Sequence, residues 1–525
     1  MPGTKGTAVS LAVKAALQFP DVEKTVFFGV TGKKYPDLPP GVETLLKSDW
    51  NRKNFLEELS RVSEGYDLTY FAWADCPLLD PALTASLSER HIKYGAEYSY
   101  ADGWPYGLAP ELLSPGTAGI LAKISENDDT TVERDTLFQV IQKDINAFDI
   151  ETEISSYDLR PYRLTLAADS KRNLLLISRL EEACRETGGK GSFTAAEAIK
   201  LLGEDPALVK KGALRTLPAF FNIQVSSACP QECSICPWPA AGAKDGPVTA
   251  RKEFISRAAF VSLLDKIEDF AGDAVISLSM WGELSLHPEK MELVNEVLER
   301  PALSLVIETS GIGWKTDELE TLARTASAAA LAKPRKNHMA PLSWIVSLDA
   351  HDPGRYKEVR GPGFSDAQAC AKKLLSLFPG NTYVQAVRVN GFEDDIEHFY
   401  RYWKEEGKNL ISGGRPDGEH VIIQKYDDFA GALPKLQASD LSPVKRRPCW
   451  HIQRDMNIFL DGTVPSCRDD LAALKGEGDK KILGNAFNED LSVIWERGMA
   501  LYLEHCNENY KGICANCDEY YTYNF

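Results

Sequence analysis

The sequence predicts an α/β protein, and three observations about its 525 residues predict this class. Residues 1–210 alternate stretches rich in aromatic and β-branched residues with helix-like stretches. From residue 219 the alternation starts again and runs through about six strand–helix pairs to residue 425. The last ninety residues carry short strands, turn signals and a group of cysteines. We therefore expect three domains, at residues 1–212, 213–435 and 436–525.

The first domain should begin with a helix, because small apolar residues recur at helical spacing over residues 8–16. Lys14 interrupts this apolar stretch and no A-x-A-like cleavage site follows, which argues against a signal peptide. Residues 24–30 and 67–75 should be buried strands, and residues 80–95 a helix. Strands that alternate with helices imply a mainly parallel sheet covered on both faces.

The second domain should be a serial β/α array, although no strict sequence repeat is present. Its expected strands are residues 219–227, 274–283, 303–311, 342–350 and 382–390. Helix-like segments lie between them, at residues 253–271, 286–299 and 366–378.

The composition is that of an ordinary soluble globular protein, with 44% hydrophobic and 26% charged residues. A formal net charge of −17 argues against a nucleic-acid-binding surface, which would be basic. No apolar run approaches the roughly 18 residues that a membrane span needs. The eleven cysteines are an odd number without an export signal, which indicates a reducing, cytoplasmic location.

Eight of the eleven cysteines fall into two clusters, which suggests metal ligands. The first cluster has the pattern C-x3-C-x2-C in "SSACPQECSICPWP". Three thiolates leave one iron of a four-iron cluster open, because such a cluster takes one protein ligand per iron. Zinc is the alternative, but a structural zinc site takes four ligands and no histidine lies near this loop. The three lone cysteines lie in apolar surroundings and should be core residues: Cys76, Cys184 and Cys370.

This cysteine loop, placed after the first strand of a β/α array, resembles the radical S-adenosylmethionine (SAM) superfamily. The resemblance implies that Cys229, Cys233 and Cys236 hold a [4Fe-4S] cluster whose open iron binds SAM. It also implies an incomplete (β/α)6 barrel, a reducing electron donor such as flavodoxin or ferredoxin, and hydrogen abstraction from a substrate by a 5′-deoxyadenosyl radical.

Later segments resemble further motifs of the same superfamily. "MWGELSLHP" is similar to its G-G-E-P segment, with Trp281 in place of the first glycine. "IETSGIG" is similar to its T-N-G segment, and "VSLDAHDPGRYKEVRG" to its S-L-D segment, which ends here at Arg360. Strand-end capping and surface pairing are the alternative roles for these residues. The resemblance implies the following SAM-binding or pocket residues: Gly282, Glu283, Ser310, Ser347, Asp349 and Arg388.

The second cysteine cluster contains a C-x12-G-x4-C interval, with Gly462 in a hairpin turn, followed by a C-x2-C pair. It resembles the single-cluster (twitch) form of the SPASM extension found behind radical SAM cores. The implied ligands of an auxiliary [4Fe-4S] cluster are Cys449, Cys467, Cys514 and Cys517. Tetrahedral zinc also fits four thiolates at this spacing. Cys506 is left as a core thiol or an alternative ligand, and His451 as a packed or outer-shell residue.

Most of residues 7–210 resembles the cytidylyltransferases of acidic sugars, which implies a Rossmann-like, GT-A-like fold. The resemblance rests on "WADCPLLDPALTASLSERH", "SYADGWPYGLAPELLS" and "YRLTLAADSKRNLLLISRLEEA". It places Asp75 and Asp169 as the pair that holds Mg²⁺, although Asp75 also suits a strand-end turn. Only "MPGTKG" precedes the first helix, where the family has a glycine-rich basic loop, so we expect a degenerate domain.

The three parts together resemble the radical SAM group called spiro-SPASM proteins. We expect a radical SAM enzyme that oxidises or cross-links a protein, peptide or sugar substrate. One alternative is a nucleotide-sugar cytidylyltransferase with an accessory cluster domain, and another is a zinc-binding scaffold.

Overall fold

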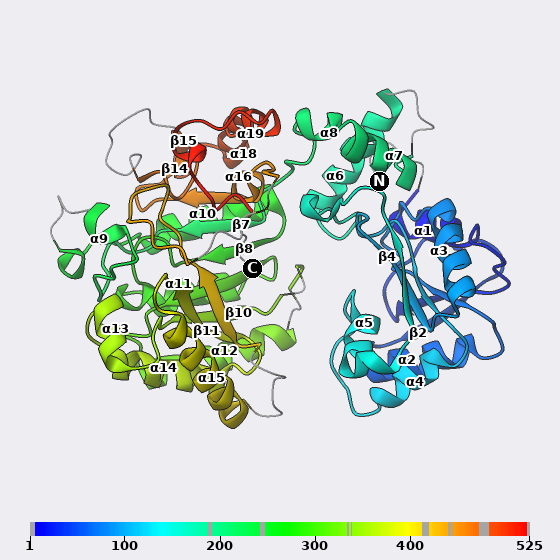
Figure 1. Cartoon of the computed structure of the whole chain (residues 1–525), viewed down its shortest axis with the longest axis horizontal. Coiled ribbons are helices and arrows are strands. Elements are labelled where there is room, and N and C mark those ends of the chain that lie inside the picture. The colour runs from blue at the N-terminus through cyan, green and yellow to red at the C-terminus, as the bar shows by residue number, and fades with distance from the viewer. Residues whose placement is uncertain are drawn as a thin grey trace. The chain divides into compact units, whose positions relative to one another are not determined.

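The computed structural model of the chain forms two compact units, Met1–Leu214 and Arg215–Phe525 (Figure 1). The structure describes residues 6–186, 192–241, 247–332, 335–337, 339–411, 419–438, 443, 445–471 and 482–521. The expected domain boundaries after residues 212 and 435 stay predictions.

The first unit contains two small sheets. Strands β1 (Thr25–Val30) and β2 (Val42–Lys47) pair in parallel. The second sheet has the order β3-β5-β4-β6, with bounds β3 (Thr69–Phe71), β4 (Tyr98–Asp102), β5 (Glu111–Leu113) and β6 (Ile150–Ile154). The main helices of the unit are α1 (Ala8–Ala16), α2 (Arg52–Ser63), α3 (Pro81–Tyr94), α4 (Thr117–Ile124), α5 (Thr136–Ile141), α6 (Lys171–Glu186), α7 (Ala195–Ala198) and α8 (Ala207–Lys210).

The prediction of a mainly parallel sheet holds for only two of the four strand pairs described in this unit. Strands β1 and β2 pair in parallel, as do β4 and β6, whereas β5 is antiparallel to both of its neighbours. The reason is the short connection between β4 and β5, which has no crossover helix. Gly103 and Gly107 turn that connection with φ of +79° and +95°, so the chain returns directly beside the strand it left.

The second unit is built on one seven-stranded sheet with the order β12-β11-β10-β9-β8-β7-β13, in which all pairs are parallel. Its strands are β7 (Phe220–Ile223), β8 (Ala274–Ser277), β9 (Leu303–Thr309), β10 (Leu342–Ser347), β11 (Thr382–Arg388), β12 (Val421–Lys425) and β13 (Asp455–Ile458). The connecting helices include α10 (Arg257–Ala271), α11 (Lys290–Leu298), α12 (Thr316–Ala332), α13 (Pro353–Val359), α14 (Phe364–Leu377) and α15 (Glu393–Leu410). The expected α/β class with a large parallel sheet is therefore confirmed.

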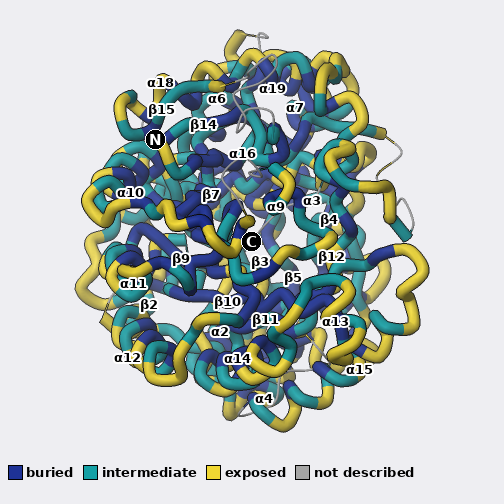
Figure 2. The backbone as a smooth tube through the Cα atoms, turned by 90° about the vertical axis from the view of Figure 1, so that its left-hand side faces the viewer, coloured by how far each residue is buried: buried dark blue, intermediate teal, exposed yellow. Residues whose placement is uncertain are grey.

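The two faces of this sheet carry different side chains. Alternate residues such as Phe221, Ile307 and Trp344 join a large apolar core with the helices. Residues of the opposite parity form a smaller apolar cluster that includes Phe220, Val306 and Ile345. The strands β7, β8 and β10 are buried along their whole length (β7 and β10 are labelled in Figure 2).

The C-terminal segment is tied to the first strand of this array. Strand β13 pairs with β7, and β14 (Thr463–Pro465) pairs antiparallel with β15 (Ile482–Asn485). Arg215, which is 1% exposed, donates from Nε to the Ile452 carbonyl at 3.0 Å and from Nη1 to the Trp495 carbonyl at 2.9 Å. The helices of the C-terminal segment include α16 (Trp450–Arg454), α18 (Leu491–Arg497) and α19 (Met499–Cys506), and the 3-10 turn η7 (Gly512–Ala515) follows α19.

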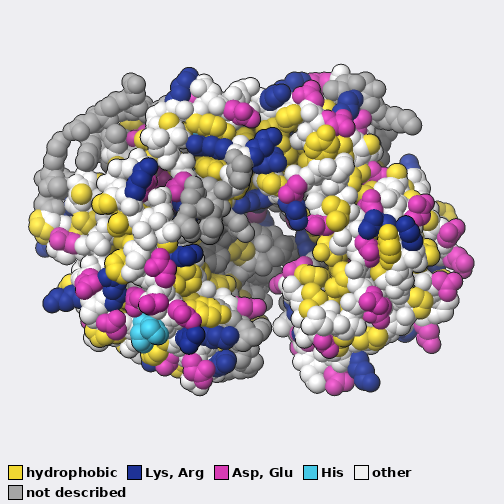
Figure 3. Space-filling view, viewed as in Figure 1, with side chains coloured by type: hydrophobic (Ala, Val, Ile, Leu, Met, Phe, Trp, Pro, Cys, Tyr) yellow, Lys and Arg dark blue, Asp and Glu magenta, His cyan; other side chains and the backbone are white. Residues whose placement is uncertain are grey.

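Among the described residues, no helix combines the length and apolarity needed to cross a membrane. On the face shown in Figure 3, acidic and basic side chains are interspersed over both units.

Candidate functional site

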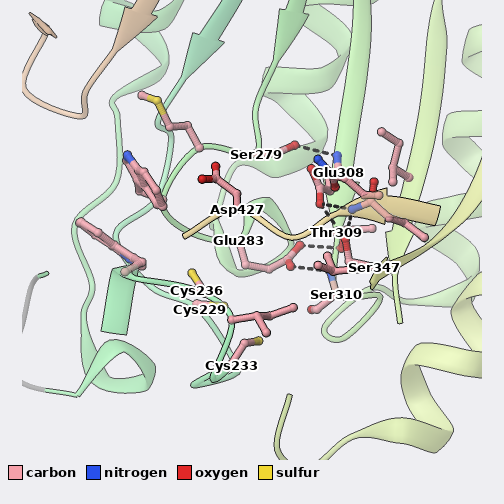
Figure 4. Close-up of a pocket in the computed structure, with 18 of the residues that line it drawn as sticks. Cys229, Cys233, Cys236, Ser279, Glu283, Glu308, Thr309, Ser310, Ser347 and Asp427 are labelled. Carbon is pink, nitrogen blue, oxygen red and sulfur yellow. Dashed lines mark hydrogen bonds between the residues drawn. The ribbon is translucent and has the colours of Figure 1, made fainter. Parts of the chain in front are cut away.

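The three cysteines of the first cluster line one cavity of about 580 Å³ in the second unit (Figure 4). They follow β7, and the cavity is lined by residues at the carboxyl ends of the neighbouring parallel strands. Backbone bonds fix the loop: Cys229 N–H donates to the Val248 carbonyl at 3.3 Å, and Ser234 N–H to the Val359 carbonyl at 2.8 Å. The thiols form no disulfide, so all three are available as ligands.

Burial sets the charge state of these thiols. It raises the pKa of all three, that of Cys236 to about 12. The Glu283 carboxylate adds to the shift at Cys229. The Arg360 guanidinium opposes it at Cys233, where Nη1 lies 3.9 Å from Sγ. Metal binding would release the thiol protons, and the positive charge of iron would offset burial and mutual repulsion. Because the three free thiols line one cavity, they suit a shared cluster.

The W-G-E segment packs directly on the cysteine loop. A Cβ at Gly282 would lie 1.9 Å from the Ser226 carbonyl oxygen, so this position requires glycine. Glu283 N–H donates to the Ala228 carbonyl at 2.8 Å. Trp281, which takes the place of a glycine in the resembling motif, adopts a φ of +49° and lines the cavity. The segment and the loop thus form one wall of the site.

Glu283 joins the ends of β8 and β9. It is 4% exposed, and its two carboxylate oxygens accept from Thr309 Oγ1 at 2.6 Å and from Ser310 N–H at 2.8 Å. Burial raises the pKa of this carboxyl, and these hydrogen bonds oppose the shift. Glu283 and Ser310 both line the cavity beside the cysteines, as the sequence predicts.

The other three predicted residues are placed differently from one another. Ser347 lines the cavity and donates to Glu308 Oε1 at 2.7 Å. Asp349 is buried behind the lining, where it accepts from Val387 N–H at 2.7 Å and pairs with Arg360. Arg388 is not among the cavity-lining residues and lies beside Lys425 in the β11–β12 ladder. The structure therefore does not bring Arg388 to the cavity.

Sequence reasoning missed several polar residues of the cavity wall. Glu308 and Gln385 face the cavity from β9 and β11, and Ser279 lies just beyond β8. The alternation of inward- and outward-facing residues along each strand could have indicated that these side chains face the cavity. In "LSLVIETSG" the one charged residue, Glu308, occupies the parity of Val306. Such a residue predicts a polar layer on the inner face.

The four predicted ligands of the second cluster interact with one another electrostatically. Burial raises the pKa of Cys449 to about 12, and the neighbouring Cys514 adds to that shift. Burial also raises the pKa of Cys467, with contributions from Cys449 and Cys517. For Cys506, burial raises the pKa to about 12, and a hydrogen bond with Tyr502 opposes the shift. Cys449 thus lies near Cys514 and Cys467, and Cys467 near Cys517, whereas Cys506 lies in a separate setting; the four as ligands of a second cluster stay a prediction.

A pair of charged residues lies between the second cysteine cluster and the cavity of the first. Arg468, next to Cys467, donates to Asp427 Oδ2 at 3.3 Å, and both residues line the cavity of the first cluster. The second cysteine group therefore adjoins the cavity wall.

In the first unit, Asp75 and Asp169 come together around an arginine. Arg134 donates to both oxygens of Asp75, at 3.1 and 2.6 Å, and to Asp169 Oδ2 at 2.9 Å. Asn173 donates to Asp169 Oδ1 at 2.8 Å. All four carboxylate oxygens thus accept a hydrogen bond from the chain, and the guanidinium lies 5.4 Å from the Trp73 ring centroid. This arrangement does not fit the expected Mg²⁺.

The C-terminal cysteines fall inside a known kind of domain. Residues 449–518 match the SPASM family, described as an iron–sulfur cluster-binding domain. The chain is therefore a protein with an iron–sulfur cluster-binding domain behind a parallel β/α array. A protein of Treponema pallidum (strain Nichols), described as an uncharacterized protein, is 35% identical over 400 residues, or 74% of this chain and 98% of the relative. The chain belongs to the family of this treponemal protein.

Solved structures show a weaker likeness. BtrN in complex with AdoMet and 2-DOIA is 16% identical, with a TM-score of 0.35 over 58% of this chain and 94% of that chain. Streptococcus suis SuiB bound to the precursor peptide SuiA is 16% identical, with a TM-score of 0.40 over 62% of this chain and 76% of that chain. Neither likeness indicates what this chain does.

Proposed function

We propose that the second unit is a radical SAM enzyme. The observation that carries this proposal is the three-cysteine loop, whose thiols line one cavity with Gly282, Glu283 and Ser310 at the carboxyl ends of parallel strands. Three thiols leave one iron of a four-iron cluster for an exchangeable ligand. The SPASM match over residues 449–518 supports the proposal independently.

Each part of the cavity wall has a role in this proposal. Cys229, Cys233 and Cys236 would hold the cluster, and the Gly282–Glu283 segment would receive the amino group of SAM. When bound, the cluster supplies the electron that cleaves SAM and starts hydrogen abstraction from the substrate. Arg360 lines the cavity beside Cys233, where its positive charge favours the thiolate form.

An aromatic wall closes one side of the cavity. The Trp281 ring lies 6.2 Å from the ring of Trp238 and 5.6 Å from that of Phe429, measured between centroids. All three rings line the cavity. They would keep water from the reacting atoms, which protects a reactive intermediate from side reactions.

The C-terminal cysteines would hold an auxiliary [4Fe-4S] cluster in the single-cluster form. Four thiolates leave that cluster no open iron, which suits electron transfer. A flavodoxin-like or ferredoxin-like donor would supply electrons in a reducing cytoplasm, where the free thiols of all eleven cysteines would persist. The product would be an oxidised or cross-linked protein, peptide or sugar.

The first unit would bind or scaffold rather than transfer nucleotides. Arg134 already pairs with both Asp75 and Asp169, the two residues that an active cytidylyltransferase-like site would use for its metal ion. CTP turnover by the purified chain would contradict this assignment.

Anaerobic reconstitution tests the proposed function. The wild-type chain should bind about eight irons if both four-iron clusters form, and it should convert SAM to 5′-deoxyadenosine after reduction. Cys233→Ala should still fold yet lose this cleavage. Stoichiometric zinc, with no binding of SAM, would support the zinc scaffold instead.

A further inference from the structure

We propose that Glu308 binds a protonated amine of the substrate in this cavity. This inference rests on the proposed function, since it concerns the molecule that would react there. It narrows the substrate to a polar, amine-bearing group.

The position of Glu308 on β9 directs it into the cavity. It shares the inner face of the strand with Val306, and both line the cavity. Its own backbone N–H donates to Ser279 Oγ at 2.7 Å, which ties β9 to the end of β8. In Figure 4 the three cysteines lie on one side of Glu283, and Glu308 and Ser347 lie on the other.

One oxygen of the Glu308 carboxylate is held by two neighbouring strands. Oε1 accepts from Ser347 Oγ at 2.7 Å on β10 and from Gln385 Nε2 at 2.9 Å on β11. Oε2 accepts no hydrogen bond from any residue that the structure describes. The carboxylate is therefore oriented by one oxygen and offers the other to a ligand.

The other charged residues that line the cavity have partners within the chain: an ion pair, or, for Glu283, hydrogen bonds. Arg360 pairs with Asp349, and Arg468 lies 3.3 Å from Asp427. Lys425 Nζ lies 3.1 Å from Asp518, and Glu283 is held by Thr309 and Ser310. Within the described part of the chain, Glu308 has no cation within ion-pairing distance. Glu308 is exposed within the cavity, so its unpaired carboxylate is open to a cationic ligand that can form a charge-assisted hydrogen bond with it.

The surroundings of Glu308 indicate what accompanies the cation. Further along the inner face, Asn222, Ser277 and Gln424 also line the cavity. Their hydroxyl and amide groups match a partner that carries hydroxyls or amides beside its amine. A cavity of about 580 Å³ lies in the range typical of small-molecule sites. The amine could belong to an amino sugar or to a lysine side chain of a peptide.

Matched probe pairs test the assignment on the reconstituted, SAM-loaded full chain without reductant. D-Glucosamine is compared with D-glucose, and Nα-acetyl-lysine amide with Nα-acetyl-norleucine amide, by ligand-detected NMR titration. The wild-type chain should bind at least one amine about tenfold more tightly than its neutral twin, as expected for a charge-assisted hydrogen bond. Preference in the first pair indicates an amino sugar, and preference in the second indicates a peptide side chain.

Two variants complete the test. Glu308→Gln should abolish the preference, whereas Glu292→Gln, an exposed glutamate on α11 outside the cavity lining, should keep it. Equal binding within both pairs, or a preference that survives Glu308→Gln, would overturn the assignment. So would a loss of SAM affinity in Glu308→Gln with no change in probe preference, because it would assign Glu308 to the ammonium of SAM. Failure of the reduced wild-type chain to cleave SAM would reject the proposed function separately.

Discussion

Gly282 occupies a position where the polypeptide cannot accept a side chain. A Cβ there would lie 1.9 Å from the Ser226 carbonyl oxygen, which is backbone and cannot move away cheaply. We predict that Gly282→Ala destabilises the protein by about 2–4 kcal/mol, the range of a severe steric mutation. It should also displace the cysteine loop and lower the affinity for SAM.

Chemical denaturation and SAM binding measure this effect. Gly119→Ala in α4 is the control, because its new methyl group meets only the Ser60 hydroxyl at 3.2 Å. A Gly282→Ala variant with wild-type stability and SAM affinity would show that the loop is not packed as described.

Arg134 gives a second prediction at the scale of single residues. Arg134→Ala should leave the Asp75 and Asp169 carboxylates without their counter-ion, so that they gain affinity for Mn²⁺, measured by electron paramagnetic resonance. Arg90→Ala, which breaks a half-buried pair with Glu151, should leave Mn²⁺ binding unchanged. Mn²⁺ binding by the wild-type chain that disappears in Asp75→Asn would contradict the prediction.

Glu111 makes the stability of the first unit depend on pH. Burial raises its pKa from the ordinary 4.5 to about 7, while a hydrogen bond from Tyr98 opposes the shift. The folded protein therefore keeps a proton that the unfolded chain loses between these values. This contribution is full below about pH 4.5 and is lost as the pH rises through about 7, and a shift of this size corresponds to about 3 kcal/mol.

We predict that Glu111→Gln flattens this dependence. Unfolding of the full chain is followed from pH 5 to pH 8, and the difference in stability between variant and wild type should change across that window. A constant difference would show that the Glu111 carboxyl titrates alike in the folded and unfolded chain.

The sequence alone predicted that the three cysteines of the first cluster, Gly282 and Glu283 belong to one site, because each of their motifs is a short continuous segment. It could not reveal that Arg134 lies between Asp75 and Asp169, since these residues are far apart in the chain and meet only after folding. Glu308 had a local signal in strand alternation, but its unpaired charge depends on every neighbouring strand.

At the scale of elements, the last helix and the turn after it separate the C-terminal cysteines. Cys506 ends α19, while Cys514 lies in the turn η7. We predict that Cys517→Ala loses about four irons per chain, because a four-iron cluster loses one of its four ligands, whereas Cys506→Ala keeps them. Iron analysis after reconstitution measures both. The reverse pattern would assign Cys506 as the ligand.

The elements of the two units differ in how well the sequence predicts them. In the second unit, the expected strands each contain an observed strand, because long apolar runs between helices leave little ambiguity. In the first unit, the direction of β5 depends on a short glycine turn rather than on any strand residue. Strand direction is thus a property of the connection, and the alternation pattern does not contain it.

At the scale of the whole molecule, the two units differ in the chemistry of their candidate sites, and we therefore propose a different role for each. The second unit has a cavity lined by free thiols and polar strand ends, which suits cofactor chemistry. In the first unit the corresponding carboxylates, Asp75 and Asp169, are already paired with Arg134 of the same chain. The reaction is therefore expected in the second unit.

The most direct test of this account is an electron–nuclear double resonance measurement on the reduced, reconstituted chain with SAM labelled at its amino nitrogen and carboxylate. The account predicts hyperfine coupling from both labels to a cluster that is lost in Cys233→Ala, because SAM would occupy the iron that the three cysteines leave open. A reduced four-iron cluster that shows no coupling to either label would contradict it.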